Sequence, residues 1–258
     1  MRRQIWQPRR ESGPPFPGSA LNRPRHGPVV ASQAGASGPP LVLLHGLAGS
    51  DAWWKRNVPA LAAAFQVVAI DLPGFGSSHP DSRLILDEVP AQVDALLGEL
   101  GIERANVMGH SMGGLVAGGL AADHPERVDR LILVDAGFLS FDPTWRHRLI
   151  GPLQTLPWTS PSILPILVRD AIRSGPVRMA RATAQVMRKD WRHKLPAISA
   201  PTLVIWGEHD RVCNPRIGKQ IVAAVPDARL VVIRGAGHNP MWEKPAEFNR
   251  EVLEFLRG

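Results

Sequence analysis

Short apolar runs alternate with longer amphipathic stretches from residue 41 to the end of the 258-residue chain. The apolar runs carry too few polar residues to present a solvent-facing side, and each stretch between them is long enough for a covering helix. This alternation is typical of an α/β fold, a mostly parallel sheet with helices on both faces. The predicted strands are 29–31, 41–45, 66–71, 106–109, 130–134, 202–206 and 229–234, and the predicted helices are 52–64, 87–100, 112–124, 215–225 and 245–257.

The alternation is interrupted once, in residues 138–200, which hold helix-like stretches at 162–173 and 177–191 but no strand-like run. We therefore predict one core, formed by residues 29–137 and 201–258, into which the interrupting segment is inserted as a small helical cap. Its apolar residues are expected to pack the cap onto the core. Whether they also line a substrate pocket is left open at this point.

Positive charge is concentrated in two parts of the chain. The formal net charge is +7, and the side chains give +5 for residues 1–28 and +7 for residues 138–200. The first of these segments is also rich in proline and glycine without apolar periodicity, so we predict a poorly ordered basic leader. No nucleic-acid-binding module accompanies the charge, and no nucleic-acid partner is expected. An anionic substrate or an anionic membrane surface is the alternative to a merely solvated basic surface.

The single cysteine, Cys213, allows no intramolecular disulfide and offers no cysteine cluster for zinc. We expect it to be a small buried residue. No run of about 18 or more apolar residues predicts a spanning helix, and the arginine-rich start lacks the apolar segment of a secretory signal. The sequence therefore favours a cytoplasmic location.

A serine lies between glycines in the run GHSMGG, residues 109–114, directly after a predicted strand. Glycine two positions on either side of Ser111 lets a strand end pack so tightly against a helix start that the serine backbone is strained. Such a turn exposes the serine hydroxyl to a base and a substrate. Because the motif is short, a purely structural turn is the alternative unless other parts of the chain agree.

Four further blocks agree with it: LLHGLAG at 43–49, DLPGFGSS at 71–78, WGEHD at 206–210 and GAGHNP at 235–240. Together with GHSMGG they resemble the α/β-hydrolase family, and the resemblance extends from residue 41 to the C-terminus. It implies the α/β-hydrolase fold, with nucleophile, acid and histidine in that chain order. It also implies chemistry that needs no metal and no cofactor.

Ser111, Asp210 and His238 stand in the implied order. A serine hydroxyl needs a base that takes its proton during attack, and His238 is the best candidate because it follows an apolar strand in a glycine-rich loop. Asp210 follows the strand at 202–206, where a carboxylate can orient the histidine and stabilise its cation. Asp135 is the competing acid, since some members of the family place the acid after the preceding strand. The other histidines of these blocks, His45, His110 and His209, are expected to support loops.

Attack on a carbonyl creates an oxyanion that needs preorganised N–H donors. The resemblance implies that one donor is the backbone N–H of Met112, the residue after the nucleophile, and that the other is the N–H of Leu47. Met112 begins a predicted helix, whose dipole also favours negative charge. The loop around Leu47 is HGLAG instead of a run of three glycines, so its shape is not fixed by the resemblance.

A serine at this turn excludes the dehalogenases and epoxide hydrolases of the family, which have an aspartate there. The parsimonious chemistry is carboxylesterase- or lipase-like hydrolysis of an ester or related acyl bond of a small molecule through an acyl-serine intermediate. The run SMGG also resembles a branch that cleaves carbon–carbon bonds in vinylogous diketo acids, the meta-cleavage-product type. A non-catalytic ligand-binding protein that kept the fold is the third alternative.

Two sets of side chains are candidates for substrate contacts. Carboxylate-bearing substrates would find possible anchors among the arginines of the cap, namely Arg146, Arg148, Arg169 and Arg188. Five tryptophans belong either to an apolar acyl site or to the core, namely Trp53, Trp54, Trp158, Trp191 and Trp242.

Overall fold

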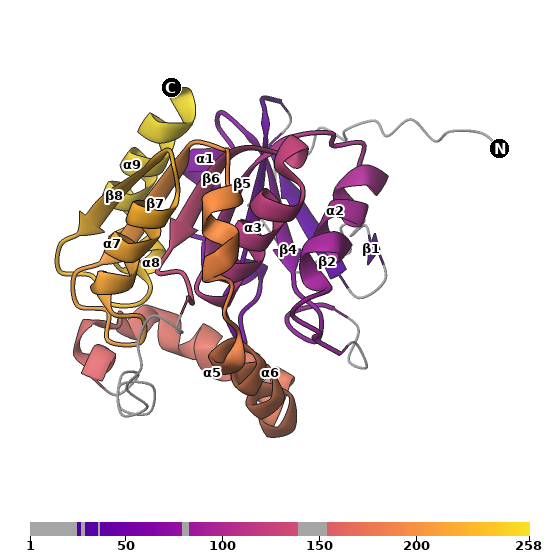
Figure 1. Ribbon diagram of the computed structural model, residues 1–258. Coiled ribbons are helices and arrows are strands. Elements are labelled where there is room, and N and C mark those ends of the chain that lie inside the picture. The colour runs from indigo at the N-terminus through magenta and orange to yellow at the C-terminus, as the bar shows by residue number, and fades with distance from the viewer. Residues whose placement is uncertain (1–24, 27–28, 36, 79–82, 139–153) are drawn as a thin grey trace.

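The computed structural model describes residues 25–26, 29–35, 37–78, 83–138 and 154–258 (Figure 1). Within them lies one 8-stranded sheet with the order β1-β2-β4-β3-β5-β6-β7-β8. The strands are β1 (Arg25–His26), β2 (Val29–Ala34), β3 (Pro40–Leu44), β4 (Gln66–Asp71), β5 (Ala105–His110), β6 (Val128–Val134), β7 (Thr202–Gly207) and β8 (Ala228–Ile233). The predicted α/β architecture is confirmed.

The sheet is mostly parallel. Strands β3 to β8 pair in parallel, whereas β2 runs antiparallel to β4, and β1 antiparallel to β2. Leu44 pairs with Gly109, and His110 pairs with Val134, so the carboxyl ends of β3, β5 and β6 meet at one edge of the sheet. In open parallel sheets this edge is where ligands bind.

Helices cover both faces of the sheet (Figure 1). One face is covered by α2 (Val89–Glu99), α3 (Met112–Asp123) and α7 (Pro215–Ala224). The other face is covered by η1 (Asp51–Trp54), α1 (Val58–Leu61), α8 (Pro240–Glu243) and α9 (Pro245–Arg257). A short 3-10 helix, η2 (Pro125–Arg127), leads into β6. Because successive strand residues point to opposite faces, Leu41 and Leu43 pack in one cluster while Val42 and Leu44 pack in the other.

The prediction of one helix at 52–64 is wrong. The chain there forms the 3-10 helix η1 and the single turn α1. Pro59 is the second residue of α1, and a proline has no N–H with which to continue a preceding helical turn. The proline therefore starts a new turn instead of extending η1.

The pairing of β1 with β2 places Arg25–His26 in the sheet, inside the segment predicted as a poorly ordered leader. The leader prediction is wrong for these two residues. The remainder of that segment, 1–24 and 27–28, lies outside the described residues.

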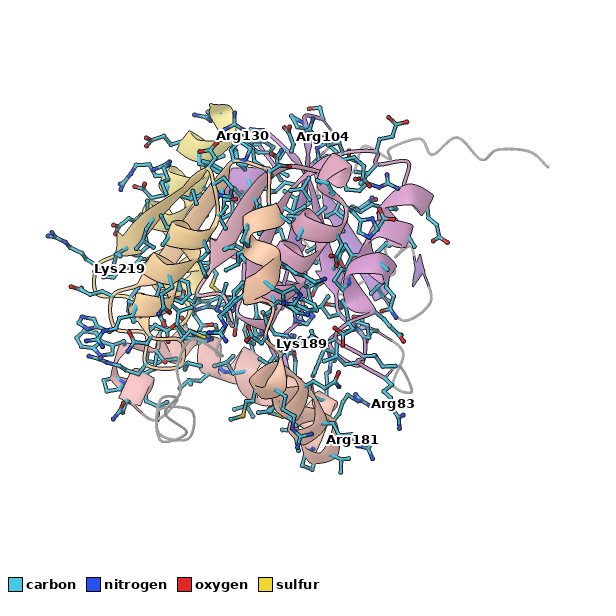
Figure 2. All side chains as sticks on the ribbon, in the orientation of Figure 1. Arg83, Arg104, Arg130, Arg181, Lys189 and Lys219 are labelled. Carbon is cyan, nitrogen blue, oxygen red and sulfur yellow. The ribbon has the colours of Figure 1, made fainter. Side chains whose placement is uncertain are left out.

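Residues 154–200 are called the cap segment below. It contains η4 (Leu156–Trp158), η5 (Pro161–Ile163), α5 (Leu164–Ser174), α6 (Pro176–Arg188) and η6 (Arg192–Ala197), close to the predicted helical stretches. Helices α5 and α6 lie beside each other at one end of the sheet (Figure 1), and Arg181 lies at the outer end of this pair (Figure 2). Residues 139–153 of the predicted cap lie outside the described residues. Among the described residues, every helix is too short or too polar to span a bilayer.

Helix α3 approaches the sheet so closely that glycine is required at Gly113. A Cβ atom at this position would lie 2.3 Å from the carbonyl oxygen of Leu44, on β3. Such a distance is well inside van der Waals contact, so any side chain would push helix and strand apart. Gly98 on α2 is different, because a Cβ there would meet only Arg127 Nη2, at 3.8 Å.

We expect Gly113→Ala to lower the free energy of unfolding by at least about 2 kcal/mol, because the overpacking outweighs the better helix propensity of alanine. The matched control, Gly98→Ala, is expected to raise it by up to about 1 kcal/mol. Urea denaturation of both variants measures the difference. Equal stabilities of the two variants would contradict the close packing of α3 on β3.

Candidate active site

Ser111 lies between the last residue of β5 and the first residue of α3, with φ 53° and ψ −116°. A non-glycine residue rarely adopts a positive φ, so this turn is strained and must be held by its surroundings. The Ser111 N–H donates to the Val134 carbonyl at 2.9 Å, and the Ser111 carbonyl accepts from the N–H groups of Gly114 and Gly137, each at 2.9 Å. Strand β6 and the loop after it therefore hold the turn in place.

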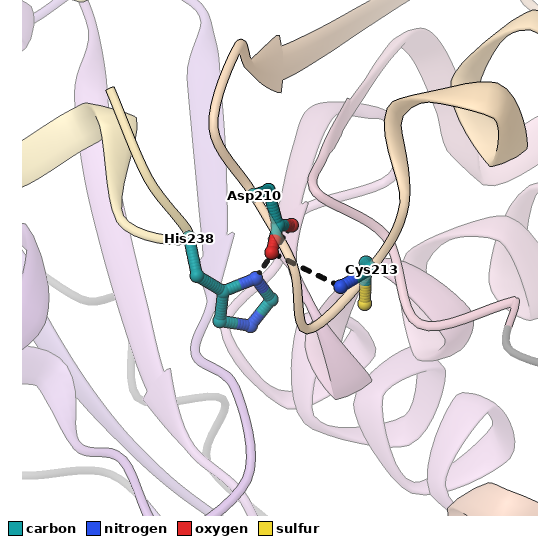
Figure 3. Close-up of side chains that lie close together, drawn as sticks. All are labelled: Asp210, Cys213 and His238. Carbon is teal, nitrogen blue, oxygen red and sulfur yellow. Dashed lines mark hydrogen bonds and ion pairs between the residues drawn. The ribbon is translucent and has the colours of Figure 1, made fainter. Parts of the chain in front are cut away.

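The three residues in the order serine, acid, histidine lie together. His238 Nδ1 donates to Asp210 Oδ2 at 2.8 Å, and His238 Nε2 lies 3.1 Å from Ser111 Oγ. Figure 3 shows the Asp210–His238 contact. Because the hydrogen bond to Asp210 keeps the ring proton on Nδ1, Nε2 is free to accept the proton of the serine hydroxyl.

Asp210 is completely buried, yet its carboxylate is fully engaged. Oδ1 accepts from the N–H groups of Val212 at 2.7 Å and Cys213 at 3.0 Å, while Oδ2 accepts from His238. Donors of this kind stabilise the charged form of a carboxylate. The thiol of Cys213 lies beside this pair (Figure 3) and is buried, as expected for a small filler. Burial, followed by the charge of Asp210, raises the pKa of this thiol well above its usual value.

Asp135, the competing acid, has a different role. It is completely buried at the end of β6, and its Oδ1 accepts from the Gly207 N–H at 2.9 Å. Burial, and after it the nearby charge of Asp210, raises the pKa of Asp135 well above its usual value. Burial and the neighbouring carboxylate of Asp210 thus both favour the protonated form of Asp135. The structure brings Asp210 to His238, whereas Asp135 binds the backbone of Gly207.

The three other histidines of the motif blocks lie where they can support loops. His45 Nε2 accepts from the Leu72 N–H at 3.0 Å, and His110 Nε2 lies 2.7 Å from the backbone carbonyl of His238. Burial, followed by the charge of His238, lowers the pKa of His110 well below its usual value, so the ring is neutral and donates from Nε2. His209 stacks on Trp158 of the cap segment, with 3.6 Å between ring centroids.

Sequence reasoning missed Glu243, on α8. Its Oε2 accepts from the Gly237 N–H at 2.6 Å and thus holds the residue before His238. Burial is the main reason why the pKa of Glu243 is raised to about 7. No sequence motif identifies this glutamate, because its role depends on the fold placing α8 beside the loop of His238.

The two predicted oxyanion donors lie on loops from neighbouring strands. Leu47 follows β3, and Met112 begins α3. A Cβ at Gly46 would lie 3.1 Å from Ser111 Cβ, so the backbone before Leu47 runs directly against the nucleophile. The donor roles of Leu47 and Met112 stay predictions, and the geometry of the two loops is compatible with them.

The cap segment lies against the loop of His238. A Cβ at Gly237 would lie 2.9 Å from Thr155 Cγ2 and 3.1 Å from Trp158 Cβ. Trp158 is 42% exposed, whereas the other four tryptophans considered for the acyl site are buried and form part of the core: Trp53, Trp54, Trp191 and Trp242.

The four candidate arginine anchors have separate fates. Arg169 binds the neighbouring Asp170, with 2.8 Å between Nε and Oδ1. Arg188 is exposed on α6. Arg146 and Arg148 lie outside the described residues.

The raised pKa of Glu243 predicts a pH dependence of stability. The pKa of this carboxyl is about 7 in the folded protein and 4.5 in the unfolded chain, so the folded protein binds its proton more tightly. The resulting contribution to the free energy of unfolding is fully present below pH 4.5 and is lost as the pH rises through 7. The melting temperature of the wild type should therefore fall, relative to that of Glu243→Gln, between about pH 5 and 8. Glu254→Gln, an exposed site on α9, is the control. The same dependence of melting temperature on pH in the wild type and in Glu243→Gln would contradict the raised pKa.

Comparison with known proteins relates the chain to one family. A family model described as the α/β-hydrolase fold matches residues 39–164 and 171–245. A 2-hydroxy-6-oxononadienedioate/2-hydroxy-6-oxononatrienedioate hydrolase of Cupriavidus pinatubonensis is 32% identical, over 88% of this chain and 90% of its own length.

Solved structures agree with this relation. A hydrolase from Pseudomonas aeruginosa superposes with a TM-score of 0.79 at 29% identity, covering 93% of this chain and 100% of that chain. An enol-lactonase from Burkholderia xenovorans superposes with a TM-score of 0.73 at 26% identity, covering 89% of this chain and 96% of that chain. The mostly parallel sheet, the matching family model and these neighbours confirm the predicted fold. The chain belongs to the α/β-hydrolase family and is an enzyme of the hydrolase class.

Proposed function

We propose that the protein hydrolyses an ester or related acyl bond of a small carboxylic substrate, with Ser111 as nucleophile, His238 as general base and Asp210 as the orienting acid. The observation that carries this proposal is the continuous contact from Asp210 Oδ2 through His238 to Ser111 Oγ, at 2.8 and 3.1 Å. A serine without such a base is a weak nucleophile at neutral pH.

In the proposed reaction, Ser111 Oγ attacks the acyl carbon while its proton passes to His238 Nε2. Asp210 stays ionised and stabilises the imidazolium that forms. His238 then gives the proton to the leaving group, and the acyl-serine remains. A water molecule gives a proton to His238 and attacks the acyl carbon. The bond between this carbon and Ser111 Oγ then breaks, the acid product leaves, and His238 returns the proton to Oγ.

The backbone N–H groups of Leu47 and Met112 are proposed to bind the oxyanion of each tetrahedral intermediate. Two features support this assignment: Gly46 lies against Ser111, and Met112 begins a 12-residue helix whose N-terminus favours negative charge. Removal of a donor of this kind costs about 100-fold or more in kcat in enzymes that use one.

Carbon–carbon bond hydrolysis is the second candidate. The relative from Cupriavidus pinatubonensis is named for a dienoic diacid substrate, and one from Comamonas testosteroni, 31% identical, is named a 2-hydroxy-6-oxo-6-phenylhexa-2,4-dienoate hydrolase. The same serine, histidine and acid can serve this chemistry if the leaving group is a stabilised carbanion. The basic residues of the cap segment would suit its carboxylate.

We further propose that residues 138–200 act as a cap that selects the substrate. The contacts of Thr155 and Trp158 with the loop of His238 support this role, because a substrate that approaches the histidine passes near them. We expect the substrate to be a small acyl compound and the reaction to need no cofactor. We expect no nucleic-acid partner, and we expect the protein to be cytoplasmic.

A panel of p-nitrophenyl esters of increasing chain length tests the leading proposal. The wild type should hydrolyse at least one of them, and Ser111→Ala should lose about 10⁴-fold or more of kcat. If the wild type turns over no ester faster than Ser111→Ala does, the proposal is contradicted. A dienoic diketo acid assayed beside the esters separates the two candidates, because a higher kcat/KM for the diketo acid would favour carbon–carbon hydrolysis.

A further inference from the structure

Asp170 is a buried carboxylate of the cap segment that faces the core. Helix α5 exposes much of its surface, but Asp170 is only 1% exposed. An ionised carboxylate in such a position requires strong partners, because its desolvation costs more than a weak contact returns. The partners of Asp170 therefore show what this part of the cap is built to hold.

Both carboxylate oxygens of Asp170 are engaged. Oδ2 accepts from Ser50 Oγ at 2.7 Å and from Trp53 Nε1 at 3.1 Å. Oδ1 accepts from Arg169 Nε at 2.8 Å, and Arg169 Nη2 lies 2.7 Å from the same oxygen. Arg169 Nη2 also donates to Ser50 Oγ at 3.1 Å, which closes the cluster. Ser50 and Trp53 belong to the core, so these bonds connect cap and core.

Ser50 and Trp53 continue the loop that carries the proposed oxyanion donor Leu47. The backbone N–H of Trp53 donates to the Ser50 carbonyl at 3.1 Å, and the backbone N–H of Gly49 donates to the Gly46 carbonyl at 3.0 Å. A Cβ at Gly46 or Gly49 would lie 3.2 or 3.0 Å from atoms of the Trp53 ring, so the indole packs across this loop.

The same indole reaches the residue before the nucleophile. The rings of Trp53 and His110 lie 5.6 Å apart, and His110 binds the backbone carbonyl of His238. Asp170 therefore holds a side chain that packs both on the loop of Leu47 and on a histidine beside the triad.

We propose that Asp170 is a positioning residue, which fixes the loop of Leu47 by binding Ser50 and Trp53 and so couples the seating of the cap to the oxyanion site. This inference rests on the proposed function for its kinetic consequence only. A misplacement of about 1 Å at such a site is enough to cost about 100-fold in rate, so a loosened loop should lower kcat rather than substrate binding.

The cap segment offers a matched control. Gln185 on α6 also binds the core, donating to the Leu84 carbonyl at 2.8 Å and accepting from the Leu86 N–H at 3.0 Å. These contacts lie in a different loop from Ser50 and Trp53. Gln185→Ala thus removes an attachment of the cap without touching the loop of Leu47.

The experiment compares Asp170→Asn, Trp53→Phe and Gln185→Ala with the wild type. Asp170→Asn is expected to lower kcat about tenfold or more with KM changed less than about threefold, and Trp53→Phe, which keeps a ring, to lower kcat about threefold or more. Gln185→Ala should keep kcat within about twofold. Hydrogen exchange of the peptide spanning residues 45–54 should rise in the first two variants and stay unchanged in the third.

Two results would overturn the proposal: unchanged exchange of residues 45–54 in both Asp170→Asn and Trp53→Phe, or an equal fall of kcat in Gln185→Ala. Trp53→Phe decides the matter alone if Asp170→Asn does not fold, since it removes the N–H that Asp170 accepts together with part of the indole packing on the loop of Leu47. If the wild type hydrolyses none of the substrates, the exchange measurement still decides, and that inactivity counts against the proposed function instead.

Discussion

The close contact of helix α3 with strands β3 and β5 governs the geometry of the whole site. A Cβ at Gly109 would lie 2.2 Å from the Gly113 carbonyl oxygen, and one at Gly113 would lie 2.3 Å from the Leu44 carbonyl oxygen. Only glycines permit this approach, and it forces Ser111 into a backbone conformation with φ 53°. The strain is sustained because hydrogen bonds from β6 and from the following loop fix the turn on both sides.

The remaining groups reach the serine because their loops leave the same edge of the sheet. Asp210 follows β7, His238 follows β8, and Leu47 follows β3. Parallel strands end together, so these loops converge although they are far apart in the sequence. Glu243, His110 and Asp170 then hold parts of the loops through contacts at 2.6 to 3.1 Å.

The apolar runs made the strands predictable from sequence, and the strand at 66–71 was predicted with its observed bounds. The motif blocks likewise pointed to Ser111, Asp210 and His238. The division of the predicted helix at 52–64 into η1 and α1 was not foreseen, because the apolar pattern continues across Pro59. The sequence favoured Asp210 over Asp135 as the acid but left Asp135 as a competitor, since both follow strands. Only the fold shows which carboxylate meets the histidine, and only the fold gives roles to Asp170 and Glu243.

Labelling of Ser111 by a fluorophosphonate, followed by mass spectrometry of the modified peptide, tests most directly whether Asp210 and His238 activate this serine. We expect rapid labelling of the wild type and a rate lower by about 10³-fold or more in Asp210→Asn. The rate in Asp135→Asn should stay within about threefold of the wild type, because His238 binds Asp210 and not Asp135. Equal labelling of Asp210→Asn and the wild type, or loss of labelling in Asp135→Asn alone, would contradict the assignment of the acid.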